Sequence, residues 1–120
     1  MYTLSSEASF DSAHFLLGYN GKCKNIHGHR WTVKMEIYGD KLKKEGHLRG
    51  MLIDFGDIKG MLKELADYLD HSFIIENKSM REITLNALKE DGFRIIEVDF
   101  RPTAENFSKY IFDYFKEKDI

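Results

Sequence analysis

Histidine and cysteine gather in one short stretch of this chain. His27 and His29 stand two residues apart with Gly28 between them. Cys23, the only cysteine among the 120 residues, precedes them, and His14 lies further upstream. Three of the five histidines therefore fall within 16 positions. Imidazole nitrogen and thiolate sulfur are ligands that zinc prefers in proteins, so we predict a zinc site at His14, His27 and His29.

The two-residue spacing has a structural meaning. Side chains at positions i and i+2 of a strand point to the same face, and the two histidines share the parity of the apolar positions in a strand predicted over residues 30–38. Two imidazoles on a covered face are costly unless a partner satisfies them, and a metal would do so. Hairpin pairing would bring His14 beside His27 and His29. Three histidines and an open fourth position describe a catalytic zinc site, although a hydrogen-bonded pair in the core is the alternative.

Cys23 admits two functional interpretations. As a fourth ligand it would close the coordination shell and make the site structural. As a free thiol near the metal, its pKa would be lowered by the cation and it could act as a base. The glycine-bounded loop at residues 18–21 favours an exposed thiol and hence the second interpretation. An unpaired cysteine can also be a small buried hydrophobe without any role in a site.

Two further pairs of polar residues follow predicted helix boundaries. Asp70 and His71 end a helix, where the carboxylate could orient the ring for proton transfer. The alternative is that the helix dipole simply stabilises a histidine at this end. Thr103 is the expected N-cap of the last helix. Glu105 lies in the first turn of that helix, where compensation of the dipole is a sufficient explanation from the residue alone.

The elements that position these residues follow from periodicity. Alternation with a period of two predicts strands over residues 2–10 and 30–38, as antiparallel neighbours. Apolar residues at helical spacing predict an amphipathic helix over residues 58–69, which Asp54 or Asp57 would cap. Weaker patterns indicate a helix at 79–91 and a short strand at 94–100, and Pro102–Thr103 opens a strongly amphipathic last helix. This order predicts an α+β fold.

Length and composition limit the class of protein. A chain of 120 residues suits one domain, which we take as residues 1–120. Eighteen basic and 20 acidic residues give a net charge of -2, so nucleic acid is not an expected partner. The chain shows neither a signal peptide nor a stretch of about 20 apolar residues, so we expect no membrane association. A single thiol suits the reducing cytoplasm.

Five motifs occur in the order found in one enzyme family. They are Phe10-x-x-x-His14, Cys23-x-x-x-His27-Gly28-His29, Gly50-Met51-x-x-Asp54-Phe55, Leu69-Asp70-His71 and Pro102-Thr103-Ala104-Glu105-Asn106. On these motifs the chain resembles the 6-pyruvoyltetrahydropterin and 6-carboxytetrahydropterin synthases. The resemblance implies the tunnelling fold (T-fold), an antiparallel sheet with helices on one face, assembled as trimers or hexamers.

The resemblance also assigns roles to residues. His14, His27 and His29 would bind Zn²⁺, Cys23 would be the general base, and the pair formed by Asp70 and His71 would relay protons. The last motif implies contacts between substrate and the residues Thr103 and Glu105.

The spacing between Cys23 and His27 looks most like that of 6-carboxytetrahydropterin synthases of queuosine biosynthesis. Such an enzyme is a lyase that acts on 7,8-dihydroneopterin triphosphate. A pyruvoyl-forming or hydroxymethyl-forming pterin enzyme is the alternative within the family. A non-catalytic zinc-binding assembly module is the alternative from another class.

The sequence departs from the family at its end. Family members continue beyond the last helix into two further strands, where a glutamate anchors the pterin ring. This chain ends at Ile120, and no residue matches that glutamate. We therefore expect the C-terminal strand pair to be missing and the chain to be truncated, since a two-stranded sheet is marginal by itself.

Overall fold

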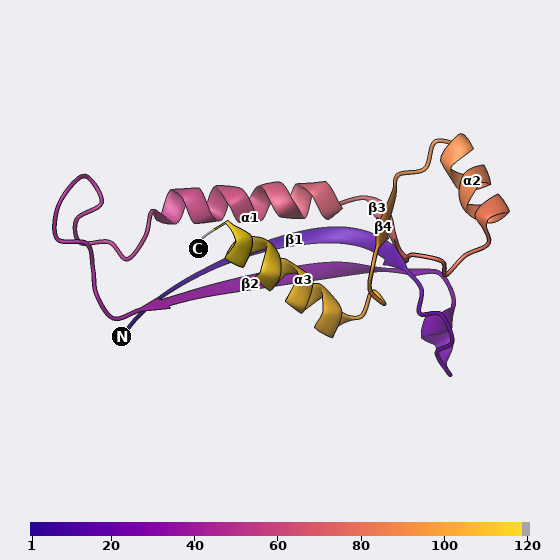
Figure 1. Cartoon of the computed structure of the whole chain (residues 1–120), viewed down its shortest axis with the longest axis horizontal. Coiled ribbons are helices and arrows are strands. Elements are labelled where there is room, and N and C mark those ends of the chain that lie inside the picture. The colour runs from indigo at the N-terminus through magenta and orange to yellow at the C-terminus, as the bar shows by residue number, and fades with distance from the viewer. Residues whose placement is uncertain (119–120) are drawn as a thin grey trace. The chain divides into compact units, whose positions relative to one another are not determined.

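Two long strands open the fold. In this computed structural model, which describes residues 1–118, β1 spans Tyr2–His14 and β2 spans His27–Gly39 (Figure 1). The hydroxyls of Ser9 and Thr32 lie 3.2 Å apart, and His14 lies opposite His27, so the two strands run antiparallel as predicted. Strand β1 begins where predicted and extends beyond its predicted C-terminal end, and β2 extends beyond both predicted ends. All three histidines consequently lie within strands.

The two faces of this hairpin differ as the alternation predicted. From position 3 to position 9 of β1, odd-numbered side chains are exposed and even-numbered ones are half-buried. In β2, positions 31, 33, 35 and 37 are half-buried between exposed neighbours. Phe10 is buried and stacks on Trp31, with the ring centroids 6.3 Å apart. The histidines share this apolar face, because their parity is that of Phe10 in β1 and Trp31 in β2.

Within residues 1–118 the sheet has four strands in the order β2-β1-β3-β4, with β3 at Ser72–Glu76 and β4 at Ile95–Val98. Ser12 pairs with Ser72 and Phe73 with Ile95, both in parallel register. The expectation of a wholly antiparallel sheet is therefore wrong for β3 and β4. Helix α2, at Glu82–Glu90, lies between these two strands in the chain and returns it to the same end of the sheet, which makes them parallel.

Strand β3 had no counterpart in the sequence analysis. Its residues are buried on both sides, and such strands lack the alternation that marks a half-exposed strand. The short strand at β4 was foreseen. With β3 and β4 added to the hairpin, the described residues form a four-stranded sheet instead of the expected two-stranded remnant.

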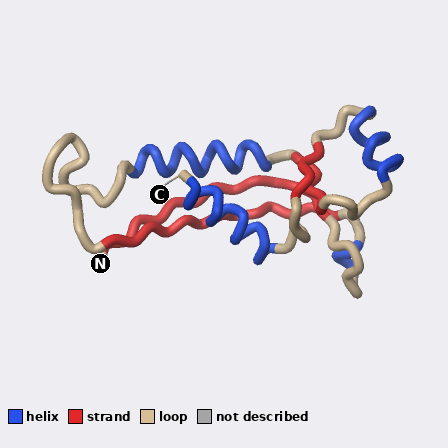
Figure 2. The backbone as a smooth tube through the Cα atoms, viewed as in Figure 1, coloured by secondary structure: helices blue, strands red, loops and turns tan. Residues whose placement is uncertain are grey.

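Helices complete an α+β fold, as predicted (Figure 2). Helix α1 spans Phe55–Leu69, and the Asp54 carboxylate accepts hydrogen bonds from the amides of Gly56 and Asp57 at 3.0 and 3.4 Å. Of the two cap residues left open by the sequence, the structure therefore selects Asp54. Helix α3 spans Ala104–Glu117, and its predicted cap Thr103 is confirmed.

The chain divides into two compact units. The first comprises Met1–Phe10 and Trp31–Tyr68, and the second comprises Asp11–Arg30 with the residues from Leu69 onward. Within the second unit, buried apolar side chains come from β3, β4 and α3: Ile74, Ile75, Val98, Phe107, Ile111 and Phe115. Every residue with a predicted site role belongs to this second unit. In the described part of the chain, no helix combines the length and apolar character needed to cross a bilayer.

Candidate metal centre and proton relay

Three imidazole rings converge where β1 ends and β2 begins. The ring centroids of His14, His27 and His29 lie 4.5 to 5.0 Å from one another. One nitrogen from each ring falls within a group whose members all lie within 4.8 Å of one another. His14 is buried, His27 is half-buried and His29 is exposed, so the cluster runs from the core to the surface. The hairpin thus brings together the three residues that the spacing singled out.

The Nδ1 atoms of His14 and His27, which face away from the centre of the cluster, are hydrogen-bonded to main-chain carbonyls. Nδ1 of His14 lies 2.7 Å from the carbonyl oxygen of Pro102, and Nδ1 of His27 lies 2.7 Å from that of Asn25. A carbonyl oxygen only accepts hydrogen bonds, so each Nδ1 carries a proton and donates it. In a neutral ring the other nitrogen, Nε2, then presents a lone pair.

Those two lone pairs face each other. The Nε2 atoms of His14 and His27 lie 3.0 Å apart, and with both Nδ1 atoms protonated neither neutral ring has a proton to place between them. A cation between the rings would turn this repulsion into attraction. Tetrahedral zinc with bonds of 2.0–2.1 Å separates its nitrogen ligands by about 3.3 Å, close to the distance found. The donor set therefore fits Zn²⁺, and imidazole also suits copper, iron and nickel.

The surroundings of His14 favour the uncharged ring that a metal requires. Burial lowers the pKa of His14, and the nearby His27 and His29 lower it further, whereas the hydrogen bond to Pro102 opposes the shift. A ring that stays neutral keeps its lone pair available, because only the deprotonated nitrogen binds a metal.

Cys23 lies beside the cluster in the chain without joining it. The thiol is half-buried in a short 3-10 turn, Lys22–Lys24, and it is not among the metal-binding group found in residues 1–118. The carbonyl of Cys23 accepts a hydrogen bond of 2.9 Å from the amide of Leu16, two residues beyond His14. The turn is thereby fastened to the end of β1. This arrangement favours the open three-histidine set over a closed set that includes the thiol.

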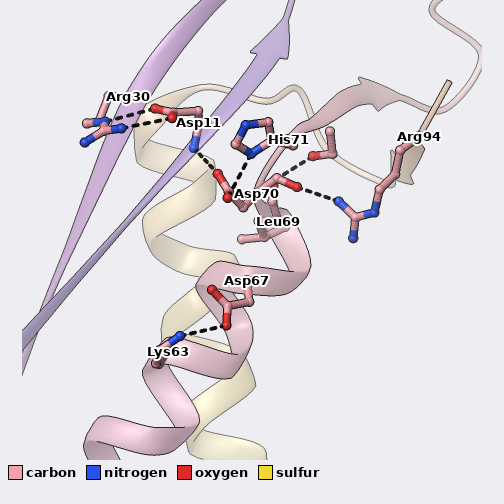
Figure 3. Close-up of polar contacts among 9 residues, drawn as sticks. Asp11, Arg30, Lys63, Asp67, Leu69, Asp70, His71 and Arg94 are labelled. Carbon is pink, nitrogen blue, oxygen red and sulfur yellow. Dashed lines mark hydrogen bonds and ion pairs between the residues drawn. The ribbon is translucent and has the colours of Figure 1, made fainter.

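Asp70 and His71 form the predicted pair at the end of α1. Nδ1 of His71 lies 2.9 Å from Oδ2 of Asp70, and 81% of the His71 side chain is exposed. Figure 3 shows the Asp70 carboxylate between this ring and the main-chain amide of Asp11, which donates to Oδ1 at 2.7 Å. That amide and the His71 ring lower the pKa of Asp70. The carboxylate therefore stays ionised and orients Nδ1, which leaves Nε2 of His71 directed away from it.

Asp11 holds this pair from the neighbouring strand. Its carbonyl accepts from the amide of His71 at 2.7 Å, and this contact accompanies a left-handed backbone at His71, with φ of 53°. Its carboxylate receives two hydrogen bonds from the Arg30 guanidinium, at 3.0 and 3.1 Å, which lower the pKa of Asp11. Asp11 precedes His14 by three residues, about 10 Å along the strand. The Asp70–His71 pair and the histidine cluster thus share one strand as their support.

The predicted substrate residues lie at the start of α3. Thr103 is half-buried, and its hydroxyl accepts from the amide of Asn106 at 3.1 Å. Glu105 is exposed in the first turn of the helix. The neighbouring Pro102, predicted only as the start of a helix, supplies the carbonyl that holds His14.

Pro102, Asn25 and Asp11 were missed as parts of the site. The first two act through main-chain carbonyls, which every residue carries, so no side-chain type marks them. Asp11 could have been noticed as the acidic residue within the Phe10-x-x-x-His14 motif.

With this geometry established, comparison with known proteins decides the family. The profile described as 6-pyruvoyl tetrahydropterin synthase matches residues 3–119. The chain belongs to the 6-pyruvoyl tetrahydropterin synthase family. A relative in Haemophilus influenzae, a 6-carboxy-5,6,7,8-tetrahydropterin synthase, is 41% identical over 97% of this chain and 83% of its own length. The protein of the same name in Aquifex aeolicus is 36% identical over 81% of this chain and 59% of its own.

A solved structure supports the fold of this family member. An uncharacterized protein from Wolinella succinogenes superimposes with a TM-score of 0.78, covering 97% of this chain and 83% of that one. At 17% identity this likeness concerns the fold alone. The tunnelling fold expected from the sequence is confirmed, with a mixed sheet in place of a wholly antiparallel one.

Proposed function

We propose that this chain is a zinc-dependent lyase of the 6-carboxytetrahydropterin synthase type and acts on 7,8-dihydroneopterin triphosphate. The observation that carries the proposal is the convergence of three imidazoles in the same compact unit as an oriented histidine and carboxylate, which the main chain of Asp11 in β1 holds. The family assignment and the 41% identical relative named as such a synthase support the type of product, and the substrate is the one that the family resemblance implies.

His14, His27 and His29 would hold the zinc ion. When bound, zinc supplies Lewis acidity toward the side-chain oxygens of the substrate. His14 and His27 prepare the site for it, because their Nδ1 atoms are already engaged with carbonyl oxygens and their Nε2 atoms converge. Such outer partners fix the orientation of a ligating ring and raise its basicity.

Cys23 and His71 would carry the protons. Cys23, as thiolate, would remove a proton from the substrate side chain. His71 would return a proton through Nε2, since its Nδ1 is held by the ionised Asp70. An ionised carboxylate stabilises a neighbouring imidazolium during such a transfer. Because Cys23 and His71 are two separate groups, the substrate side chain could lose a proton from one atom and gain a proton at another.

Thr103 and Glu105 would contact the substrate from the start of α3. Departure of triphosphate, followed by a retro-aldol-type carbon–carbon cleavage that consumes one water molecule and releases acetaldehyde, would give the 6-carboxy product. By the same family resemblance we propose a cytoplasmic homo-oligomer, a trimer or hexamer, in queuosine biosynthesis.

Two other functions compete with this one. A pyruvoyl-forming enzyme of the same family would use the same histidines, and its product would distinguish it. A non-catalytic zinc-binding module would bind the metal without turnover, and the oriented pair of Asp70 and His71 speaks against it.

The test combines zinc content with product analysis for the parent chain and its Cys23→Ala variant. We expect about one zinc ion per chain in both, because the thiol lies outside the metal-binding cluster. We expect acetaldehyde and a 6-carboxypterin from the parent only. His47→Ala, which changes a loop histidine outside the cluster, serves as the control and should match the parent.

The outcomes separate the alternatives. Zinc in both chains without turnover in either would reject the lyase and favour the non-catalytic module. Loss of zinc from Cys23→Ala would make the thiol a ligand and reject its role as base. A pyruvoyl product would keep the family and change the reaction.

A further inference from the structure

The turn that precedes α3 is connected to the histidine cluster. The carbonyl oxygen of Pro102 lies 2.7 Å from Nδ1 of His14, across 88 positions of sequence. Pro102 is less than 2% exposed and His14 is 3% exposed, so water does not compete for this hydrogen bond. The direction of one carbonyl group therefore decides which nitrogen of His14 faces the other two rings.

Pro102 occupies the centre of a tight turn. The amide of Thr103 donates to the carbonyl of Arg101 at 2.7 Å, an i to i+2 hydrogen bond that closes around the proline. Such an inverse γ-turn requires φ near the value that the proline ring imposes. With the Arg101 carbonyl used to close the turn, the Pro102 carbonyl is left for His14.

Asn106, in the first helical turn of α3, is hydrogen-bonded to the γ-turn around Pro102. Its side-chain Nδ2 donates to the carbonyl of Arg101 at 2.9 Å, and its amide donates to the hydroxyl of Thr103 at 3.1 Å. Asn106 thus forms hydrogen bonds with the residues before and after Pro102. The arrangement differs from the usual capping box, in which Glu or Gln at this position accepts a hydrogen bond from the cap residue.

The chemistry explains why an amide stands at this position. The Arg101 carbonyl accepts from the Thr103 amide and has a second lone pair, to which Asn106 donates. A carboxylate of the same size as the Asn106 amide has no donor at neutral pH. An aspartate there would place two oxygens against each other and loosen the turn. The helix itself would tolerate the change, because negative charge in the first turn is favourable to the helix dipole.

We propose that Asn106 is a positioning residue of the metal centre: it holds the turn at Arg101 to Thr103, so that the Pro102 carbonyl fixes the tautomer and orientation of His14. This inference rests on the proposed function, because it gives Asn106 a role toward the zinc ion. It also gives the last motif a second task besides substrate contact, namely support of a ligand that lies far away in the sequence.

The first test is a zinc titration of the metal-free chain against a chromophoric chelator, for the parent and Asn106→Asp. We expect the variant to bind zinc about tenfold more weakly, at the lower end of the range for outer partners because Asn106 acts through one further link. The thermal midpoint of the metal-free chain should stay near that of the parent. Asn86→Asp makes the same change at an exposed position of α2 and should leave both values unchanged.

A second measurement does not need the metal. In the metal-free parent, the Nδ1 proton of His14 should give a downfield proton NMR signal that exchanges slowly with solvent, because it is buried against the Pro102 carbonyl. In Asn106→Asp this signal should exchange faster or disappear, while Asn86→Asp should retain it.

Each result decides something. Equal zinc affinity in the parent and Asn106→Asp would overturn this inference and leave the proposed function intact. A variant whose thermal midpoint falls together with its zinc affinity would assign Asn106 a structural role only and would also overturn it. A parent chain that binds no zinc would overturn the proposed function. In that case the NMR measurement still tests the inference, because an unchanged His14 Nδ1 proton signal in Asn106→Asp would reject the positioning role.

Discussion

The histidine cluster and the Asp70–His71 pair use the same ring in two environments. His14 is 3% exposed and its Nδ1 faces a neutral carbonyl, whereas 81% of the His71 side chain is exposed and its Nδ1 faces an ionised carboxylate. In both cases one nitrogen is fixed and the other is left for chemistry. Burial and the charge of the partner therefore distinguish a ring suited to a metal from a ring suited to carrying protons.

The two regions also differ in what supports them. Around the cluster, the partners are main-chain carbonyls of Asn25 and Pro102, which cannot ionise. Around the pair, the support is an ion pair on the surface, in which Arg30 holds Asp11 while the main chain of Asp11 holds Asp70 and His71. We therefore expect the geometry of the histidine cluster to be insensitive to salt, and the geometry of the Asp70–His71 pair to change with ionic strength.

We expect the largest effect from a substitution that disrupts the histidine cluster. His14→Ala removes its most buried ligand, so we expect zinc affinity to fall by more than about 100-fold, beyond the range for outer partners. Turnover should be lost with the metal. Zinc titration and an assay with dihydroneopterin triphosphate measure both quantities. Retention of tight zinc binding by His14→Ala would show that the cluster does not hold the metal.

A change in the relay should separate the two regions. His71→Ala removes an exposed ring, so we expect unchanged zinc content and a thermal midpoint near that of the parent. Turnover should fall by about 10²- to 10⁴-fold, the usual contribution of a positioned acid or base. Asp70→Asn should act in the same direction. Full activity in His71→Ala would exclude the ring from proton transfer.

The smallest expected effect concerns the surface support. Arg30→Gln removes the guanidinium that lowers the pKa of Asp11, and 73% of the Arg30 side chain is exposed. Exposed ion pairs contribute little, so we expect turnover to fall by less than about fivefold and zinc affinity to stay the same.

The pH dependence of unfolding provides its control. A carboxyl group with a lowered pKa stabilises the fold above its unfolded value, 3.8 for an ordinary Asp, and that contribution disappears as pH falls through the folded value. Arg30→Gln should therefore reduce the loss of stability between neutral and acid pH. Equal acid sensitivity in both chains would show that Arg30 does not support Asp11.

Residue types and local periodicity were enough to predict the histidine cluster and most of the local structure. The residue types and spacing of His14, His27 and His29 predicted the cluster, because a hairpin with a period of two can place them on only one face. Periodicity also predicted the strands of the hairpin and helices α1 and α3. Thr103 indicated where α3 begins, whereas the choice between Asp54 and Asp57 at the start of α1 was made only by the structure. These features depend on side chains that are close in sequence, so they can be read locally.

The contacts that hold the site in place could not be predicted from the sequence. Strand β3 was missed because its residues are buried on both sides, which removes the alternation that reveals a strand. The bond from His14 to Pro102 spans 88 positions, and that from Asp11 to Asp70 spans 59. The first uses a main-chain carbonyl, which every residue carries, and the second uses a main-chain amide, which every residue but proline carries. Which carbonyl or amide meets a given side chain depends on how strands and turns pack, and no residue type marks that choice in advance.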